Sequence, residues 1–320
     1  MRFGRLVVTG AAGFIGGHLL RTALRQGVSV LGVVRDAGGI AARASMADVL
    51  AHPHLLAGAD VLVHAAAIRH RHNADPRAYR ASNVDLVDAL VRAAAGRVGR
   101  FVLVSSVGVY GFPRELPITE ASPFAPCTLY SETKIEAETL VARLAPSLGL
   151  RYTIVRPTIV YGAGDTNGML DKLAAMLLAR RYRVVGSGEN TLHHTHVDDV
   201  VRGVLTLAGS AAGVNEHFII AGPETITLRR LGELVARAVG VEVPRMRIPL
   251  RLARLAASCI DLATSHGLAF TKTEPPINNE KLDVMTVPIS FDPSKARAAG
   301  FVPRIGYDEG IARTLGTWTK

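Results

Sequence analysis

Short, continuously apolar runs alternate with longer segments of mixed polarity along much of the chain. The runs are rich in valine, isoleucine and leucine, whereas the longer segments have the alanine, leucine and charged residues typical of helices. Strands that are apolar along their whole length are expected where helices cover both faces of a parallel sheet. The pattern therefore predicts an α/β fold with a doubly wound parallel sheet. The expected strands are residues 5–8, 28–34, 61–64, 101–105, 152–155 and 217–220, with helices at 17–26, 84–95 and 131–144.

The pattern is less regular elsewhere. Residues 41–56 have helical composition but no convincing strand, so a third strand stays open there. We expect a first domain of residues 1–165, to which 195–222 return, and a smaller C-terminal lobe made mostly of 166–194 and 223–320. After residue 165 the pattern predicts helices at 169–180, 195–207, 228–239 and 250–263, a loop or short strand at 182–192 and an extended stretch at 275–289.

Three evenly spaced glycines, Gly10, Gly13 and Gly16, follow the first expected strand and lead into a helix, with Phe14 and Ile15 between the last two. Glycine permits a tight turn and lets a phosphate approach the backbone closely, and the N-terminus of a helix favours negative charge. The turn therefore predicts a site for the pyrophosphate of a dinucleotide. It makes the sheet Rossmann-type and leaves the C-terminal lobe to bind the substrate.

Tyr130 and Lys134 are four residues apart in a segment of helical composition, so they lie on one face of a helix. A tyrosine, with an ordinary pKa of about 10, serves as an acid or base near neutral pH where a cation stabilises the phenolate. Alone, the pair would fit an amphipathic helix with an incidental tyrosine and lysine. Together with the glycine turn, it indicates a nicotinamide-dependent enzyme.

Composition and charge narrow the class of protein. The chain has 320 residues, 48% of them hydrophobic, which is enough for one large core with an added lobe. We expect a cytoplasmic protein without a membrane partner, because no signal peptide or span-length apolar stretch is evident and Cys127 and Cys259 form no disulfide framework. The net charge of +10 comes from scattered arginines without a basic tail, which favours solubility over a nucleic-acid partner, and we expect a small-molecule substrate.

The glycine spacing and the Tyr130–Lys134 pair together resemble the extended short-chain dehydrogenase/reductase superfamily, in particular its NAD-dependent epimerase/dehydratase family. The resemblance covers nearly the whole chain and implies that Ser106, four residues before Tyr110 and Gly111, is the catalytic serine. It further implies that Tyr130 exchanges a proton with the substrate oxygen, that Ser106 hydrogen-bonds this oxygen, and that Lys134 holds the cofactor ribose and lowers the tyrosine pKa. Homodimers are common in this superfamily, so we expect one here.

The resemblance also assigns cofactor contacts. The acidic residue that binds the ribose of NAD is replaced by Val34, and Arg35 follows it. Because a guanidinium binds a phosphate well, we expect NADP to be preferred. NAD is the alternative, with Arg35 stacked on adenine and Asp36 on the ribose. The other implied contacts are Asp48 and Val49 at adenine, Ala65, Ala66 and Ala67 under the nicotinamide ribose, Asn83 supporting the active site, and Pro157 and Ile159 beside the nicotinamide. Alanines there would also fit ordinary packing at a strand end.

Two departures from the family pattern bear on the substrate. Val107 and Gly108 replace the acidic pair of 4,6-dehydratases, so we exclude that reaction. Leu192 stands where nucleotide-sugar epimerases keep an arginine for the diphosphate, so Arg69 or Arg71 would have to replace that contact. The predicted substrate contacts are Arg69, Ser106, Thr158 and His194. No metal is expected at His193, His194 and His196, because no cysteine or carboxylate completes a ligand set.

The sequence thus favours NAD(P)-dependent hydride transfer at a secondary alcohol or ketone carbon of a sugar-like small molecule, by a ketoreductase or sugar epimerase. A dehydrogenase of the 3β-hydroxysteroid type, acting on a bulky apolar alcohol, is the first alternative, consistent with Leu192 and the apolar 250–263 segment. The second alternative is a non-catalytic protein that senses a dinucleotide. The complete set of Ser106, Tyr130 and Lys134 argues against it, since a sensor needs no acid/base group.

Overall fold

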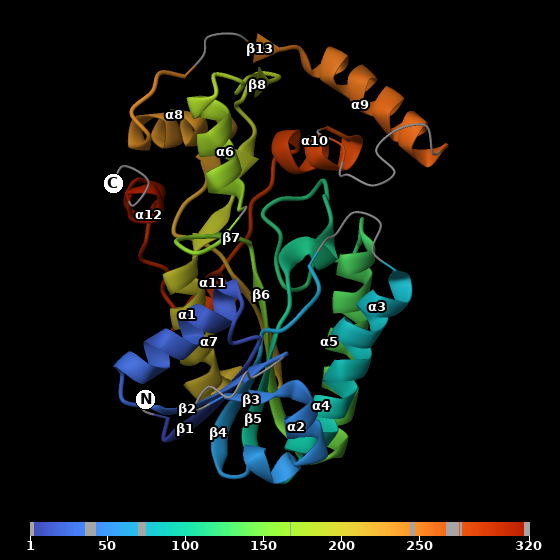
Figure 1. Ribbon diagram of the computed structural model, residues 1–320, viewed down its shortest axis with the longest axis vertical. Helices are drawn as coiled ribbons and strands as arrows, with labels where there is room; N and C mark the ends of the chain where they lie inside the picture. The colour runs from blue at the N-terminus through green and yellow to red at the C-terminus, as the bar shows by residue number, and fades with distance from the viewer. Residues whose placement is uncertain are drawn as a thin grey trace.

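The structure, a computed structural model, describes residues 3–35, 43–69, 75–166, 168–243, 247–266, 275 and 277–316. Within these ranges the central sheet has seven parallel strands in the order β11-β6-β5-β4-β1-β2-β3 (Figure 1). The strand order reverses beside β1, which is where doubly wound sheets bind their ligands. The predicted fold class is confirmed. The strands are β1 (Arg5–Thr9), β2 (Ser29–Val34), β3 (Arg43–Ser45), β4 (Ala59–His64), β5 (Val98–Val104), β6 (Arg151–Pro157) and β11 (Glu216–Ile220).

Helices cover both faces of this sheet because alternate strand residues point to opposite sides. Leu6 and Val8 share one core with residues of α1 and α7, whereas Val7 lies in a second core with residues of α4 and α5. Figure 1 shows the two layers on either side of the strands. The layer helices are α1 (Phe14–Arg25), α7 (Val197–Gly209) and α11 (Ser294–Ala298) on the first face, and α2 (Met46–Ala51), α4 (Leu86–Ala94) and α5 (Leu129–Ser147) on the second.

A smaller lobe lies beyond the carboxyl edge of the sheet, at the top of Figure 1. Its core contains residues of α6, α8 and α12, and a separate small cluster joins α9 to α10. Its elements are α6 (Met169–Leu178), β8 (Val184–Val185), β9 (Thr191–Leu192), β12 (Ile226–Thr227), α8 (Leu228–Ala238), β13 (Arg247–Ile248), α9 (Leu250–Ser265), α10 (Asn279–Thr286) and α12 (Tyr307–Leu315). Because α7 and β11 return to the sheet, the chain interleaves its two parts; the division at residue 165 remains a prediction.

Several short strands and turns lie outside the central sheet and the main helices. β7 (Ile159–Tyr161) pairs with β10 (His194–His196), and α3 (Pro76–Arg80) runs into a π-helical turn, η2 (Ala81–Asp85), before α4. The 3₁₀ turns are η1 (Pro53–Leu56), η3 (Val107–Tyr110) and η4 (Ala211–Gly213). Along the described part of the chain, every helix is too short or too polar to traverse a bilayer.

Two expectations about elements change. The third strand, left open above, exists as β3, whose three residues pair with β2 and are too few to leave a pattern. The expectation of an extended stretch at 275–289 is wrong, because α10 occupies most of it. The Asn278 side chain caps this helix by accepting from the Lys281 backbone N–H, and Leu282 is buried in the cluster shared with α9.

Candidate active site

The turn between β1 and α1 has the geometry that its glycines require. Gly10 has a φ of +69°, and a Cβ added to it would lie 2.8 Å from the Ala66 backbone nitrogen, beyond the end of β4. A Cβ on Gly16 would lie 2.1 Å from the Gly10 carbonyl oxygen. The turn is closed by the Gly13 N–H, which donates to that same oxygen at 2.8 Å. A side chain at Gly10 would collide with the segment after β4, and one at Gly16 would collide with the backbone of the turn itself.

The N-terminus of α1 is suited to an anion. Gly13 is its N-cap, no side chain caps it, and its first turn carries no acidic residue. The first N–H groups and the positive end of the helix dipole are therefore available to a phosphate. Phe14 and Ile15 are partly buried at this end of the helix. The residues present thus fit a dinucleotide pyrophosphate.

The predicted adenine end lies at the ends of β2 and β3. Val34 ends β2 and Arg35 follows it with an exposed side chain, whereas Asp36 lies outside the described residues. The Asp48 carboxylate accepts the Ser45 backbone N–H at 3.1 Å in the capping box of α2, and the Ser45 side chain, followed by its backbone N–H, lowers the pKa of Asp48. The Val49 side chain is fully buried in the core. A contact between Val49 and adenine is therefore restricted to its backbone.

Tyr130 and Lys134 lie on the first turns of α5, as the spacing predicts. The helix begins at Leu129 because the Thr128 side chain caps it in a capping box with Ser131. Ser106, which follows β5, accepts the Gly108 N–H at 3.1 Å, and its hydroxyl is close enough to Tyr130 to lower the pKa of the phenol. The serine and the tyrosine therefore meet at the carboxyl edge of the sheet.

The electrostatics differ from the expectation that Lys134 lowers the pKa of Tyr130. Burial raises the pKa of Tyr130 to about 12, and the opposing effects come from the Arg69 charge and the Ser106 hydrogen bond. The Lys134 ammonium instead donates to the Val104 carbonyl oxygen at 2.6 Å, and burial lowers its pKa to about 8. In this arrangement the Arg69 charge acts on the pKa of Tyr130 while Lys134 points toward β5, and the role of Lys134 in lowering that pKa stays a prediction.

The segment after β4 is held beside α5 by Asn83 on the π-helical turn. The Asn83 amide accepts the Ile68 N–H at 2.9 Å and donates to the Ile68 carbonyl and the Thr133 hydroxyl, each at 3.1 Å. π-Turns often occur at functional sites. Through Ile68 the turn holds the partly exposed Ala65, Ala66 and Ala67 at the carboxyl end of β4.

Arg69, another predicted substrate contact, follows this segment and is close enough for its charge to act on Tyr130. Its guanidinium is 3.4 Å from the Asp165 carboxylate, and its carbonyl accepts the Tyr79 hydroxyl at 3.0 Å. Asp165 and Tyr79 were not predicted from the sequence, since neither lies in a motif that would indicate a contact with Arg69. Arg71 lies outside the described residues.

Two predicted substrate contacts are buried among other side chains, and their contact with a substrate stays a prediction. Thr158 is 3% exposed, and its hydroxyl is 2.7 Å from that of Thr195. His194 is also 3% exposed and packs edge-on against Tyr307, whose hydroxyl accepts the His194 N–H at 2.8 Å. Burial lowers the pKa of His194 to about 3. Ile159, in contrast, is 40% exposed and available to a ligand, whereas Pro157 lies buried at the end of β6.

A buried ion pair between Glu138 and Arg156 lies behind Lys134 and was not predicted, although Glu138 follows Lys134 by four residues and so lies on the same face of the helix. Glu138 is one helical turn beyond Lys134 and accepts from the Arg156 Nε and Nη2 atoms at 3.0 and 2.6 Å. Arg156 also donates to the Tyr110 hydroxyl. The negative charge of Glu138 partly offsets the effect of burial on the pKa of Lys134.

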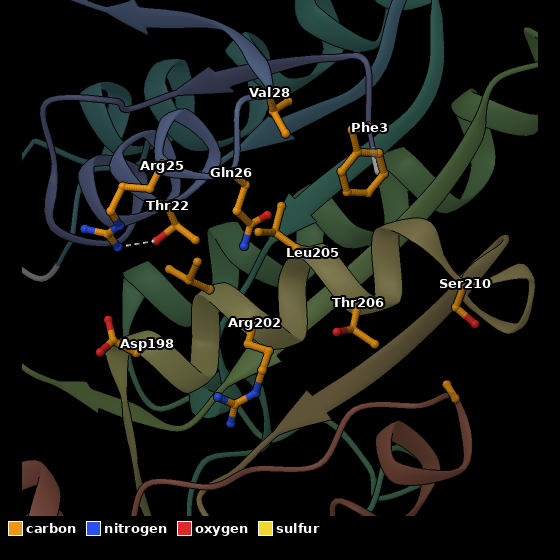
Figure 2. A pocket seen from close by; sticks show the side chains of 12 residues that line it. Phe3, Thr22, Arg25, Gln26, Val28, Asp198, Arg202, Leu205, Thr206 and Ser210 are labelled. Atoms are coloured by element: carbon orange, nitrogen blue, oxygen red, sulfur yellow. Dashed lines mark hydrogen bonds between the residues drawn. The ribbon is translucent and has the colours of Figure 1, made fainter. Parts of the chain in front are cut away.

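A groove of about 780 Å³ lies between α1 and α7, and Figure 2 shows its lining. Arg25 and Thr22 contribute from α1, and Asp198, Arg202 and Leu205 from α7. None of the predicted catalytic residues lines it. Across the described ranges, moreover, histidine, cysteine and acidic side chains form no group of three or more suited to a metal.

A doubly wound sheet with a dinucleotide turn and an adjoining serine, tyrosine and lysine defines the extended short-chain dehydrogenase/reductase class. Residues 6–221 match the model of the NAD dependent epimerase/dehydratase family, and the chain belongs to this family. It is therefore an NAD(P)-dependent enzyme of the extended short-chain type.

Known relatives of the chain span several reactions. It is 32% identical over 265 residues to 4-hydroxy-2-methyl-3-oxo-4-farnesyl-3,4-dihydroquinoline-1-oxide ketoreductase of Stigmatella aurantiaca, covering 79% of this chain and 78% of the relative. It is also 32% identical to UDP-glucose 4-epimerase of Mycolicibacterium smegmatis, with 97% of each chain covered. The structure of UDP-glucuronic acid 4-epimerase from Bacillus cereus in complex with NAD shares the fold, with a TM-score of 0.76, 20% identity and coverage of 99% of this chain and 100% of that one.

Proposed function

We propose that the chain reduces a ketone to a secondary alcohol, with Ser106, Tyr130 and Lys134 as the catalytic residues. The observation that carries this proposal is the placement of Ser106, after β5, close enough to Tyr130, on the first turn of α5, for the serine hydroxyl to lower the pKa of the phenol. Because burial raises the pKa of Tyr130 to about 12, its phenol is protonated near neutral pH. A protonated phenol is the form required to donate a proton to a ketone oxygen.

Each residue then has one task. The bound nicotinamide supplies the hydride that forms the new C–H bond at the carbonyl carbon. Tyr130 donates its phenolic proton to the carbonyl oxygen, which takes the electron pair of the broken C=O π bond. Ser106 holds that oxygen by a hydrogen bond. Lys134 binds the cofactor ribose, and Arg69 stabilises the phenolate that remains until a solvent proton replaces the one transferred.

The preferred cofactor in this proposal is NADP, with NAD as the alternative. The exposed Arg35 follows Val34 at the end of β2, where a carboxylate would repel an added phosphate. The wider cofactor set is Gly10, Gly13, Phe14, Ile15, Gly16, Asp48, Val49, Ala65, Ala66, Ala67, Asn83, Pro157 and Ile159, as the family resemblance implies.

For the substrate, we propose a sugar-like or apolar ketone rather than a nucleotide sugar bound by an arginine clamp. Leu192, in the clamp position, is 4% exposed and packs in the core of the lobe. Arg69 is already close to Asp165, so its charge is partly neutralised. The relatives include both a quinoline ketoreductase and a UDP-glucose epimerase, so a sugar epimerase is the second candidate.

A substrate panel tests this proposal. The protein is mixed with NADPH or NADH and with nucleotide sugars, free keto-sugars or apolar cyclic ketones, and the absorbance of the reduced nicotinamide is followed. We expect net oxidation of NADPH with a ketone. Interconversion of a nucleotide sugar without net cofactor turnover would instead establish the epimerase. Calorimetry with UDP on the native protein and on Arg69→Ala supplies the control. Tight binding of UDP that is lost in the variant would show that Arg69 binds the diphosphate in place of the missing arginine at position 192.

The assembly in this proposal is a cytoplasmic homodimer, as the family resemblance implies. Light scattering of the purified chain tests the dimer directly.

A further inference from the structure

Helix α9 presents leucines away from the rest of the molecule. Leu252, Leu255 and Leu262 are 60%, 64% and 62% exposed, and Cys259 is exposed between them. Their spacings of three, four and three residues place them on one face of the helix. Exposed leucines are ordinary when scattered singly, but a whole helical face of them requires an explanation.

The opposite face already has its partners. Ala253 and Ala257 are buried in the small cluster that includes Val185 and Leu282. Arg254 pairs with Asp283 of α10 at 2.8 Å, and Asp261 accepts from the Asn279 backbone N–H and side-chain amide. In Figure 1, α9 runs along the outer edge of the lobe with α10 beneath it. The apolar outward face therefore does not serve to attach α9 to the lobe.

The charges around this face are positive. Arg247 of β13 and Arg251 of α9 are exposed and precede Leu252 in the chain, and Asp261, the acidic residue of α9, bonds to Asn279 of α10. The whole chain carries a net charge of +10. A second copy seated on this face would bring the same arginines against it, whereas an anionic surface would be attracted to them.

We propose that the outward face of α9 binds the surface of an anionic lipid bilayer. Leucines on one side of a helix with arginines beside them are typical of helices that lie in the membrane interface. The helix has 16 residues, so it is roughly 24 Å long and suited to lying flat on the bilayer. The expectation of no membrane partner was based on the lack of a spanning segment, which a surface-bound helix does not need.

This arrangement would place the substrate lobe against the membrane, with the sheet domain in solution. It would suit a substrate that dissolves in, or is anchored to, the bilayer. The proposal does not depend on the reaction, because binding to lipid is measured without cofactor or substrate.

Flotation with lipid vesicles tests the proposal. The full chain should bind vesicles of phosphatidylglycerol and phosphatidylcholine, and bind vesicles of phosphatidylcholine alone much less. The variant Leu255→Gln/Leu262→Gln should bind the anionic vesicles at least about tenfold more weakly, because two leucines no longer enter the interface. The matched control is Leu24→Gln/Leu148→Gln, which changes leucines that are 54% and 38% exposed on another part of the surface. It should bind as the native protein does.

A second variant tests the charge. Arg247→Gln/Arg251→Gln should weaken binding to the anionic vesicles severalfold, and added salt should reduce this difference. Thermal unfolding of all variants confirms that they are folded. The proposal is overturned if the native chain does not bind anionic vesicles, or if the leucine variant binds them equally well. It is also overturned if light scattering shows a dimer that only the leucine variant loses, without lipid binding, since the face would then be a protein interface.

Discussion

Lys134 has its ammonium inside the protein, 2% exposed and bonded to the Val104 carbonyl. Burial disfavours the charged form, and Glu138 one turn away opposes that effect only in part. The residue that is to bind the cofactor ribose is therefore close to losing its proton at mildly alkaline pH. Its titration should affect folding stability as well as cofactor binding.

The pH dependence of stability follows from this shift. The pKa of Lys134 falls from 10.5 to about 8 on folding, so between these values the unfolded chain binds more protons than the folded chain. The free energy of unfolding should therefore rise with pH across this window, by up to about 3 kcal/mol from this group. Lys134→Met should lose that rise, whereas Lys172→Met, which changes an exposed lysine of α6, should keep it. Urea unfolding at a series of pH values measures the difference; parallel curves for the native protein and Lys134→Met would refute the shift.

Arg35 decides the choice of cofactor in the proposed function. Arg35→Ala should weaken NADPH binding by about 1–3 kcal/mol, because a charge-assisted contact with the added phosphate is lost, and should barely change NADH binding. Fluorescence titration with both cofactors measures this. Arg21→Ala is the control, because it removes an exposed arginine of α1 away from the end of β2. Equal losses for NADPH and NADH would show that Arg35 stacks on adenine instead.

At the scale of elements, the turn between β1 and α1 positions the cofactor helix against β4. Gly27 provides a matched comparison with Gly10, because its φ is +73° but a Cβ added there would meet nothing within 4 Å. Gly27→Ala should lower the free energy of unfolding by about 1–2 kcal/mol, because alanine is strained in the left-handed backbone conformation. Gly10→Ala should cost more and also weaken dinucleotide binding, since its Cβ would displace the Ala66 backbone. Unfolding and cofactor titration of both variants check this. Equal stability and equal cofactor affinity of the two variants would show that close packing against Ala66 is not why glycine is needed at position 10.

The elements that the sequence predicts well are those with a strong pattern. The parallel strands are buried on both faces and read as continuous apolar runs, and α5 has a helical composition and a clear cap. β3 is too short to show any periodicity. α10 has only eight residues, of which Leu282 is buried, so its apolar pattern is too weak to indicate a helix. Its helical state depends on the Asn278 cap and on packing against α9, which only the folded chain supplies.

At the scale of the whole molecule, the site is assembled from segments distant in sequence. Motifs predicted Ser106, Tyr130 and Lys134, because local spacing and strand ends determine where they lie. The link between Arg69 and Asp165 spans 96 positions and has no local signal. The burial of Thr158 and His194 likewise results from packing between the lobe and the sheet, so the sequence around these two residues does not show that they are buried.

The central claim is that Tyr130 transfers the proton that accompanies hydride transfer. Its most direct test is the turnover of Tyr130→Phe with the ketone and cofactor that the panel identifies, beside Tyr152→Phe, which removes a hydroxyl near the amino end of β6. Tyr130→Phe should lower turnover by roughly two to four orders of magnitude with nearly unchanged cofactor affinity. Tyr152→Phe should retain turnover close to that of the native protein. Near-native turnover in folded Tyr130→Phe would contradict the account.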